Sequence, residues 1–251
     1  NTIYHNWPGV FAATAFLSGL AGDGAGSSEA AFAIALWAPL GFNLLLLMVL
    51  RYVFRGLTAR AAVVWLALLH YFTMTWVGQD YFSPQAVASV LYLAAMGVLL
   101  HRPRGGPGRT VLFTVLVAGM AVTHQITLLI LVISVLALVL TRRVRGWYLP
   151  VLVVVIVSTW ALTFAYEYTT YNLEELISGL GTPISNADAT FDKSEGATTA
   201  QQVVIWGDRF TVAAGAALAL LGVWRTRREG TLKWTAVVLM LAPVTVMGFM
   251  S

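Results

Sequence analysis

The chain has 251 residues and a formal net charge of +4, with 59% hydrophobic and only 10% charged residues and a mean hydropathy of +0.78. Soluble domains carry about 25% charged residues, so this composition excludes an ordinary soluble fold. It predicts an all-α, polytopic transmembrane helical bundle. The lack of cysteine excludes disulfides and cysteine-based metal sites. Because the first residue is not methionine and the last lies in an apolar run, we expect residues 1–251 to be one transmembrane domain and a fragment of a longer chain.

The N-terminal region predicts a short helix at the membrane surface and then a first full crossing. Residues 10–20 are apolar over only about half of the ~20 residues that span a bilayer, and Pro8 suits a helix start. We therefore expect an interfacial helix there. Residues 23–28 are rich in glycine and serine and predict a loop, whereas residues 29–50 predict a full span.

Further apolar runs follow, and a long polar segment separates two of them. The runs cover residues 61–76, 84–100, 110–141, 147–164, 210–224 and 234–250. Residues 167–208 are polar and predict an extracytoplasmic loop segment within the domain.

The charges alternate between the two ends of these runs. Nearly all of the 15 Lys and Arg residues lie in four loops, and Glu229 is the one acidic residue that shares a loop with them. By the positive-inside rule the basic loops are cytoplasmic, which gives about eight crossings with both chain ends outside. Anionic lipid attracts such loops, so the pI of 9.6 does not indicate nucleic-acid binding. We expect an integral protein of a bacterial plasma membrane.

Residues 110–141 do not match a single crossing. They are too many for one span and too few for two spans of about 20 residues, and basic residues lie at both of their ends. We therefore predict a hairpin of two short helices that turns at Thr123-His124-Gln125. At about 1.5 Å per residue each arm spans only about 20 Å, so the turn is recessed below the outer surface and lines an extracytoplasmic pocket.

Three polar segments are predicted at the same outer end of the bundle: Tyr4-His5-Asn6-Trp7, the turn over residues 79–85, and Thr123-His124-Gln125. A pocket between them offers a carboxylate as base or metal ligand, imidazoles, amides for hydroxyl-rich ligands and aromatic faces. The candidate substrate-binding residues are His5, Gln79, Asp80, Tyr81, Ser83, Gln85, His124, Gln125 and Arg209.

Each candidate also has a structural interpretation. Asp80 can cap a helix, and His124 can be a turn residue whose hydrogen bonds are made within the protein. His5 can anchor the chain at the membrane–water interface. The guanidinium of Arg209 suits a lipid phosphate, but a local pair with Asp208 explains that residue equally well.

The N-terminal layout resembles a known enzyme family. Tyr4-His5-Asn6-Trp7-Pro8-Gly9-Val10-Phe11, a short helix and an Ala-rich span ending Arg51…Arg55-Gly56-Leu57-Thr58 resemble the first part of the GT-C type glycosyltransferases. These are polytopic enzymes that use polyprenyl-phosphate-linked sugars. The similarity covers the layout of about residues 1–145, and the turn over residues 79–85 stands where the family has an acid-bearing turn. His-Asn-Trp-Pro replaces the family's doubled proline.

The resemblance implies transfer of a sugar from a polyprenyl-phosphate donor on the extracytoplasmic face. The family's catalytic Asp or Glu lies in a loop that would precede Asn1, so no catalytic residue is assigned. No metal site is assigned either, and cofactor dependence stays open, a divalent metal included. Expected partners are membrane lipids, the lipid-linked sugar, and other membrane subunits or the rest of the same chain.

Two other functions fit the composition. A transporter or lipid flippase would bind cargo in the same pocket, but it predicts ionisable residues deep within spans, and this sequence has few apart from His70. We expect His70 to be a hydrogen-bond partner between helices. A non-catalytic subunit of a membrane complex is the third possibility.

Overall fold

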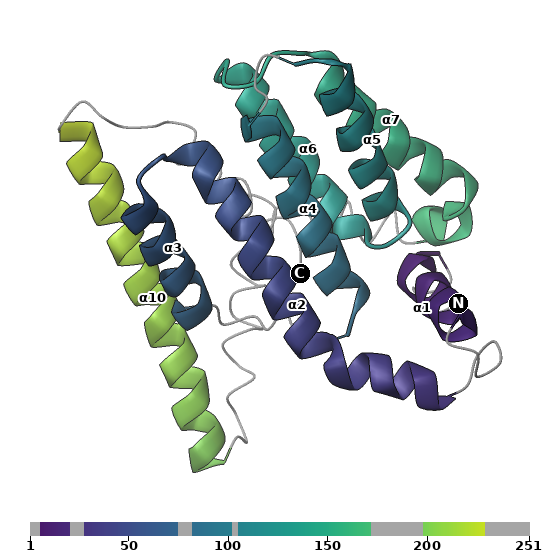
Figure 1. The fold of residues 1–251 in the computed structure, drawn as a ribbon, viewed down its shortest axis with the longest axis horizontal. Helices are drawn as coiled ribbons and strands as arrows, with labels where there is room; N and C mark the ends of the chain where they lie inside the picture. Colours follow the sequence, from purple (N-terminus) through teal and green to yellow (C-terminus); the bar gives the residue numbers. More distant parts are fainter. Residues whose placement is uncertain (1–5, 21–27, 75–81, 102–104, 172–197, 229–251) are drawn as a thin grey trace.

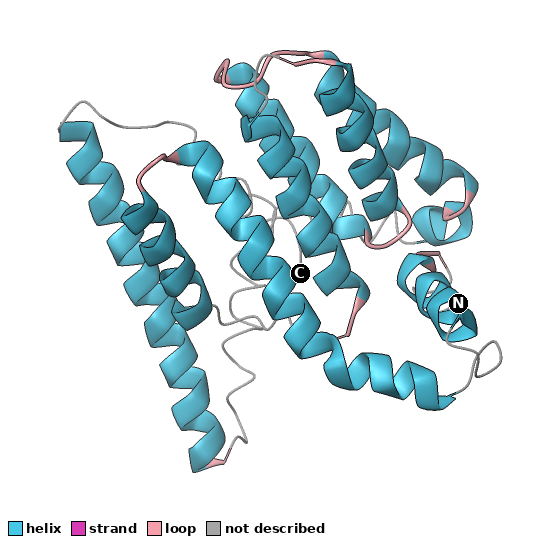
Figure 2. Ribbon diagram, viewed as in Figure 1, coloured by secondary structure: helices cyan, strands magenta, loops and turns pink. Residues whose placement is uncertain are grey.

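The computed structural model describes residues 6–20, 28–74, 82–101, 105–171 and 198–228, and every regular element in these ranges is a helix (Figure 1 and Figure 2). This confirms the predicted all-α class. The helices are α1 (Gly9–Leu20), α2 (Ser28–Leu57), α3 (Ala61–Met74), α4 (Pro84–His101), α5 (Pro107–Ala121), α6 (Gln125–Leu140), α7 (Tyr148–Thr163) and α10 (Thr199–Arg228). A further short helix covers residues 166–171. The run predicted at residues 234–250 lies outside the described residues.

Three of the described helices are long and apolar enough to cross a membrane. They are α4, α10 and the part of α2 from Phe32 to Leu57. The other apolar helices, α1, α3, α5, α6 and α7, have 12 to 16 residues. A 16-residue helix is about 24 Å long, less than the ~30 Å hydrocarbon core of a bilayer. Helix length therefore supports three crossings among the described residues and not the full predicted set of about eight.

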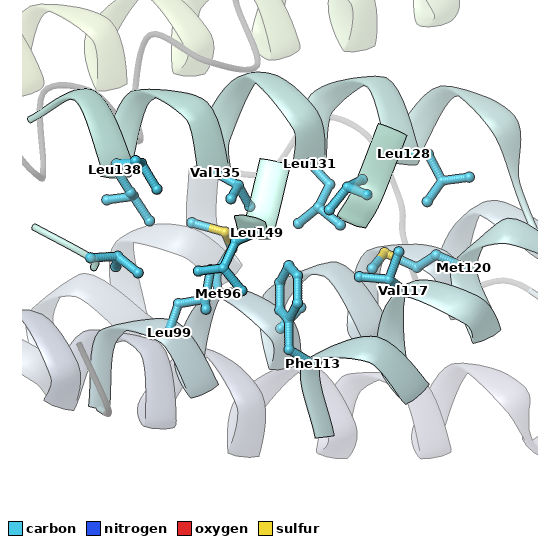
Figure 3. Packing of buried hydrophobic residues seen from close by; sticks show 14 of the residues in the cluster. Met96, Leu99, Phe113, Val117, Met120, Leu128, Leu131, Val135, Leu138 and Leu149 are labelled. Carbon is cyan, nitrogen blue, oxygen red and sulfur yellow. The ribbon is translucent and has the colours of Figure 1, made fainter. Parts of the chain in front are cut away.

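Helices α4 to α7 pack around one apolar core. Figure 3 shows Leu131 and Val135 of α6 on one side of this core, with Met96 of α4 and Phe113 of α5 on the other. All four side chains are buried. Lipid tails are as apolar as leucine, so helices within a bilayer associate through close van der Waals packing and not through a hydrophobic force between them.

One hydrogen bond crosses this core between α4 and α6. The Tyr92 hydroxyl lies 2.9 Å from Ser134 Oγ, and Ser134 Oγ donates to the carbonyl oxygen of Ile130 at 2.8 Å. Because the serine proton is used in that bond, Tyr92 is the donor to Ser134. A polar pair of this kind fixes the register of two helices whose other contacts are apolar.

Helix α2 bends and then lies along α4. Pro39 lies inside α2, where it removes a backbone donor, and Figure 1 shows the bend in this helix. At the other end of α2 the Tyr52 ring lies over Gly97 of α4 and stacks on His101, with ring centroids 4.1 Å apart. His101 Nε2 also lies 2.8 Å from the carbonyl oxygen of Tyr52. Small residues thus allow α2 and α4 to approach closely.

Helix α10 packs on α3 at the left of Figure 1. The imidazole of His70 on α3 faces Gly215 of α10, where an added Cβ would lie 3.4 Å from Nε2. His70 is therefore a contact residue between two helices. Its ring packs against the backbone of α10, and among the described residues it makes no hydrogen bond between helices.

Two helices are longer than the apolar runs predicted. Helix α2 continues to Leu57 and carries Arg51 and Arg55 on its last turns. Basic side chains there interact favourably with the negative end of the helix dipole. Helix α10 begins at Thr199, within the segment expected to be a loop, and helix 166–171 occupies the start of that segment.

A capping box explains the early start of α10. The Thr198 backbone N–H donates to Gln201 Oε1 at 2.9 Å, and the Gln201 N–H donates back to Thr198 Oγ1 at 3.4 Å. This reciprocal pair provides acceptors for two backbone N–H groups that have no acceptor within the helix. At 30 residues, α10 is about 45 Å long and extends beyond the apolar run that predicted it.

The described arginines gather at one end of the bundle. The C-terminal ends of α2, α4, α6 and α10 and the N-terminal ends of α3, α5 and α7 lie toward the top of Figure 1. Apart from Arg209, the described arginines lie in or beside these helix ends. We call this the basic end. The grouping agrees with the charge alternation seen in the sequence.

Arg109 differs from the other residues of the basic end because it is buried, with only 1% of its surface exposed. Its Nη2 donates to the carbonyl oxygen of Arg145 at 2.9 Å and to the Tyr148 hydroxyl at 3.0 Å. The Tyr148 hydroxyl also lies 2.9 Å from Thr110 Oγ1. The sequence placed Arg109 at the end of a basic loop, whereas in the structure it lies in the first turn of α5 and joins this helix to the loop before α7.

Candidate functional site

The predicted hairpin is confirmed. Helix α5 ends at Ala121 and α6 begins at Gln125, so residues 110–141 do not form one helix. The backbone N–H groups of Thr123 and His124 donate to the carbonyl oxygen of Met120 at 3.0 and 2.9 Å, which closes the turn. We call residues 122–125 the hairpin tip. It lies at the end of the bundle opposite the basic end (Figure 1).

The N-terminal segment is fixed against the hairpin tip. The Gly9 N–H donates to the carbonyl oxygen of Val122 at 2.8 Å. A Cβ on Gly9 would lie 2.7 Å from that same oxygen, so the close approach needs glycine at this position. The start of α1 therefore docks on the tip, as Figure 1 shows beside the lower ends of α5 and α7.

Aromatic side chains from the end of α7 and from helix 166–171 hold the same segment. Trp160 Nε1 donates to the carbonyl oxygen of Asn6 at 3.0 Å. Trp7 is buried and meets the Tyr168 ring edge-on, with centroids 5.0 Å apart. Each indole or phenol ring adds a large apolar contact and a polar edge that can be hydrogen-bonded.

Two side chains of the hairpin tip present polar groups beside these rings. Gln125 Nε2 donates to the Tyr168 hydroxyl at 3.2 Å, and His124 Nδ1 lies 3.0 Å from Thr127 Oγ1. The hydroxyl of Thr123 donates to the carbonyl oxygen of Gly119 at 2.6 Å and is therefore used within the hairpin. We call five side chains of the hairpin tip and of the segments docked around it the tip cluster. Its members are Trp7, His124, Gln125, Trp160 and Tyr168.

Burial lowers the pKa of His124, which lies outside both helices of the hairpin. The imidazole is therefore neutral at pH 7. Because the unfolded chain takes up the proton more readily, the stability contributed by the neutral ring is present above about pH 6.5 and is lost as the pH falls below it. Among the described residues Nε2 has no hydrogen-bond partner, so this nitrogen can bind a ligand hydroxyl.

The structure tests only some of the other candidate residues. His5, Gln79, Asp80 and Tyr81 lie outside the described residues. Ser83 caps α4, because its Oγ accepts the N–H of Ala86 at 3.1 Å. Gln85 lies in the first turn of α4, and α4 contacts α1. Ser83 and Gln85 therefore lie at the start of a helix that contacts α1.

Arg209 is separated from the tip cluster. It lies on α10, which packs on α3 across the molecule from α1 and the hairpin tip (Figure 1). Its guanidinium lies over the Trp206 ring of the same helix, 4.9 Å from the ring centroid. The two residues form a local cation–π contact.

Trp160 and Tyr168 are the members of the tip cluster that the sequence did not single out. Trp160 lies near the far end of an apolar run, where its indole N–H needs an acceptor, and this requirement was the available signal. Tyr168 gave no such signal, because it lies in a segment expected to be loop. Only the chain reversal after α7 brings its ring to the hairpin tip.

The described part of the chain offers limited chemistry at this end. Within it, no three His, Asp or Glu side chains lie together as a possible metal site. The tip cluster provides a neutral imidazole, an amide, a phenol and two indoles. Side chains of these types can form hydrogen bonds and aromatic contacts with hydroxyl-bearing ligands.

No protein-family model, curated protein or solved structure matches this chain. The resemblance to the GT-C glycosyltransferases therefore rests on the layout of the sequence. Function must be argued from the site itself.

Proposed function

We propose that the chain is an integral membrane protein of about eight crossings, with the basic end in the cytoplasm and the tip cluster on the extracytoplasmic side. The division of charge between the two ends supports this orientation, because cytoplasmic loops of membrane proteins are rich in Lys and Arg. The apolar side chains exposed on α2, α3, α7 and α10 suit contact with lipid.

A recessed pocket at the tip cluster follows from helix length. Helix α6 has 16 residues and is about 24 Å long, so its start lies short of the far surface when its end lies at the near one. Polar groups at such a depth need protein or water around them. The docked N-terminal segment and the end of α7 supply part of that surrounding.

We propose that this pocket belongs to a GT-C type glycosyltransferase-like protein that uses a polyprenyl-phosphate sugar donor. The single observation that carries the proposal is that the N-terminal segment, the hairpin tip and the end of α7 meet at the end opposite the arginines. In this scheme the acceptor hydroxyl attacks the anomeric carbon, the bond from that carbon to the phosphate oxygen breaks, and polyprenyl phosphate leaves. The acceptor proton passes to a general base that is not assigned to a residue.

The tip cluster would position the acceptor. Neutral His124 and Gln125 can hydrogen-bond its hydroxyls, and the aromatic rings can cover its apolar faces. By the resemblance of the sequence, Asp80 occupies the place of the acid-bearing turn of the GT-C family. It would contact the same acceptor. A carboxylate there would hold a hydroxyl in the reactive orientation.

A transfer assay on the full-length protein tests this function. Asp80→Asn is expected to lower turnover about a hundredfold, because a misplacement of the reacting group by about 1 Å can cost about 10²-fold. The measurement is transfer of labelled sugar from a polyprenyl-phosphate donor in proteoliposomes. Glu229→Gln makes the same carboxylate-to-amide change at the predicted basic end and should leave turnover unchanged. Equal turnover of Asp80→Asn and wild type would remove Asp80 from the site, and a lack of transfer by wild type would reject the function.

The orientation has a separate test that exploits the absence of cysteine. Single variants Gln79→Cys and Arg143→Cys can be labelled with a maleimide that does not cross membranes, with no background from native thiols. In intact cells we expect labelling at position 79, and labelling at position 143 only after the membrane is opened. Labelling of both positions from the same side would contradict the proposed orientation and, with it, the outer pocket.

A further inference from the structure

The loop between α6 and α7 carries a concentrated positive charge. Arg142, Arg143 and Arg145 are all exposed, and residues 105–148 contain no Asp or Glu to neutralise them. Two large apolar side chains flank the arginines: Leu140 is 59% exposed and Trp147 is 62% exposed. Exposed cations beside exposed apolar groups suit the boundary between lipid headgroups and acyl chains.

The backbone of this loop is held by its own hydrogen bonds. The N–H groups of Arg143 and Val144 both donate to the carbonyl oxygen of Leu138, at 2.9 and 3.2 Å. Arg142 has a φ of 56°, the left-handed conformation that turns the chain after a helix. Val144 is only 2% exposed and anchors the loop in the core of the bundle. The arginines therefore project from a rigid turn.

A second element fixes the loop from the side of α5. The buried guanidinium of Arg109 donates to the carbonyl oxygen of Arg145 and to the Tyr148 hydroxyl, at 2.9 and 3.0 Å. The backbone from which the exposed arginines extend is thus fixed before any ligand binds. Such preorganisation reduces the entropy lost on binding.

We propose that residues 142–147 form a binding site for the phosphate groups of anionic bilayer lipids. A guanidinium presents a planar set of donors that matches a phosphate, and three of them on a rigid turn can contact one or two headgroups. The indole of Trp147 would lie at the level of the glycerol backbone. This inference uses the membrane placement proposed above but does not depend on glycosyl transfer.

The lipid site can be tested by titrating the purified chain in a non-ionic detergent with phosphatidylglycerol. The midpoint of thermal unfolding at each lipid concentration gives an apparent Kd. A variant in which Arg142, Arg143 and Arg145 are all glutamine should bind phosphatidylglycerol about a hundredfold more weakly than wild type. The matching lysine variant keeps the charge and the fold, and should bind within about tenfold of wild type. Phosphatidylcholine, inorganic phosphate and glycerol phosphate serve as the other probes.

The end of α10 offers a control with the same change in charge. Arg225, Arg227 and Arg228 lie in its last turn, and the Arg228 guanidinium stacks over the Trp224 ring at 4.0 Å. Replacing these three arginines by glutamine should alter the affinity less than threefold.

Four results would overturn the proposal. The first two concern affinity for phosphatidylglycerol: an equal loss of affinity in the two glutamine variants, or no loss in either. The other two concern the midpoint of thermal unfolding: phosphatidylcholine, or the soluble phosphates, raising it as much as phosphatidylglycerol does. A chain that fails to enter phosphatidylcholine nanodiscs would instead contradict the membrane placement itself, so the two failures are distinguishable.

Discussion

Replacing Arg109 by alanine is expected to lower the free energy of unfolding by about 3 kcal/mol. Hydrogen bonds from a charged group contribute about 1.5–3 kcal/mol, and Arg109 makes two at the basic end, to the Arg145 carbonyl oxygen and the Tyr148 hydroxyl. The variant would also leave a cavity where the buried Arg109 side chain packs, which adds to the loss. SDS-induced unfolding of wild type and variant in mixed micelles measures the difference.

The matched control for this prediction is Arg143→Ala, which removes the same charge from an exposed side chain of the loop that Arg109 contacts. Changes at such surface positions are usually within about 0.5 kcal/mol. Arg109→Lys should lie between the two, because an ammonium lacks the planar fork that reaches both acceptors. If Arg109→Ala and Arg143→Ala lost the same stability, the buried guanidinium would not be what joins α5 to the loop before α7.

Gly97→Ala is expected to cost about 2 kcal/mol by separating α2 from α4. An added Cβ would overlap Cδ1 of Tyr52, well inside van der Waals contact. The Tyr52 ring cannot move aside freely, since it stacks on His101 with centroids 4.1 Å apart. Overpacking of this kind typically costs 1–3 kcal/mol. The same SDS titration gives the change.

Helix propensity alone would make Gly97→Ala stabilising, by up to about 1 kcal/mol, so the sign of the effect is diagnostic. Gly41→Ala on α2 supplies the control, because its added Cβ meets no atom within 4 Å and only the propensity gain remains. A Tyr52→Ala background should remove most of the cost at position 97, and the double-mutant cycle measures the coupling. A stabilising Gly97→Ala would mean that α2 and α4 do not pack as described.

The sequence alone determined the helical class, most of the helices and the hairpin. Apolar length and the arginines at both ends of residues 110–141 required a turn near His124, and the structure has it. These features follow from local rules, since a bilayer span needs a given length and a positive charge avoids lipid. The Thr198–Gln201 capping box was also readable in the sequence, but the polar character of its surroundings suggested a loop.

Only the tertiary structure decided which polar groups meet. The sequence gives no sign that the Trp160 indole reaches the Asn6 carbonyl oxygen, 154 positions away, or that Tyr168 turns back to Gln125. It also presented Arg109 as one more residue of a basic loop, with no sign that the side chain is buried. Charge and hydropathy depend on the residue itself, whereas burial and partnership depend on which helices pack together. That packing is set by the fit of many side chains at once, so a pattern along one chain does not reveal it.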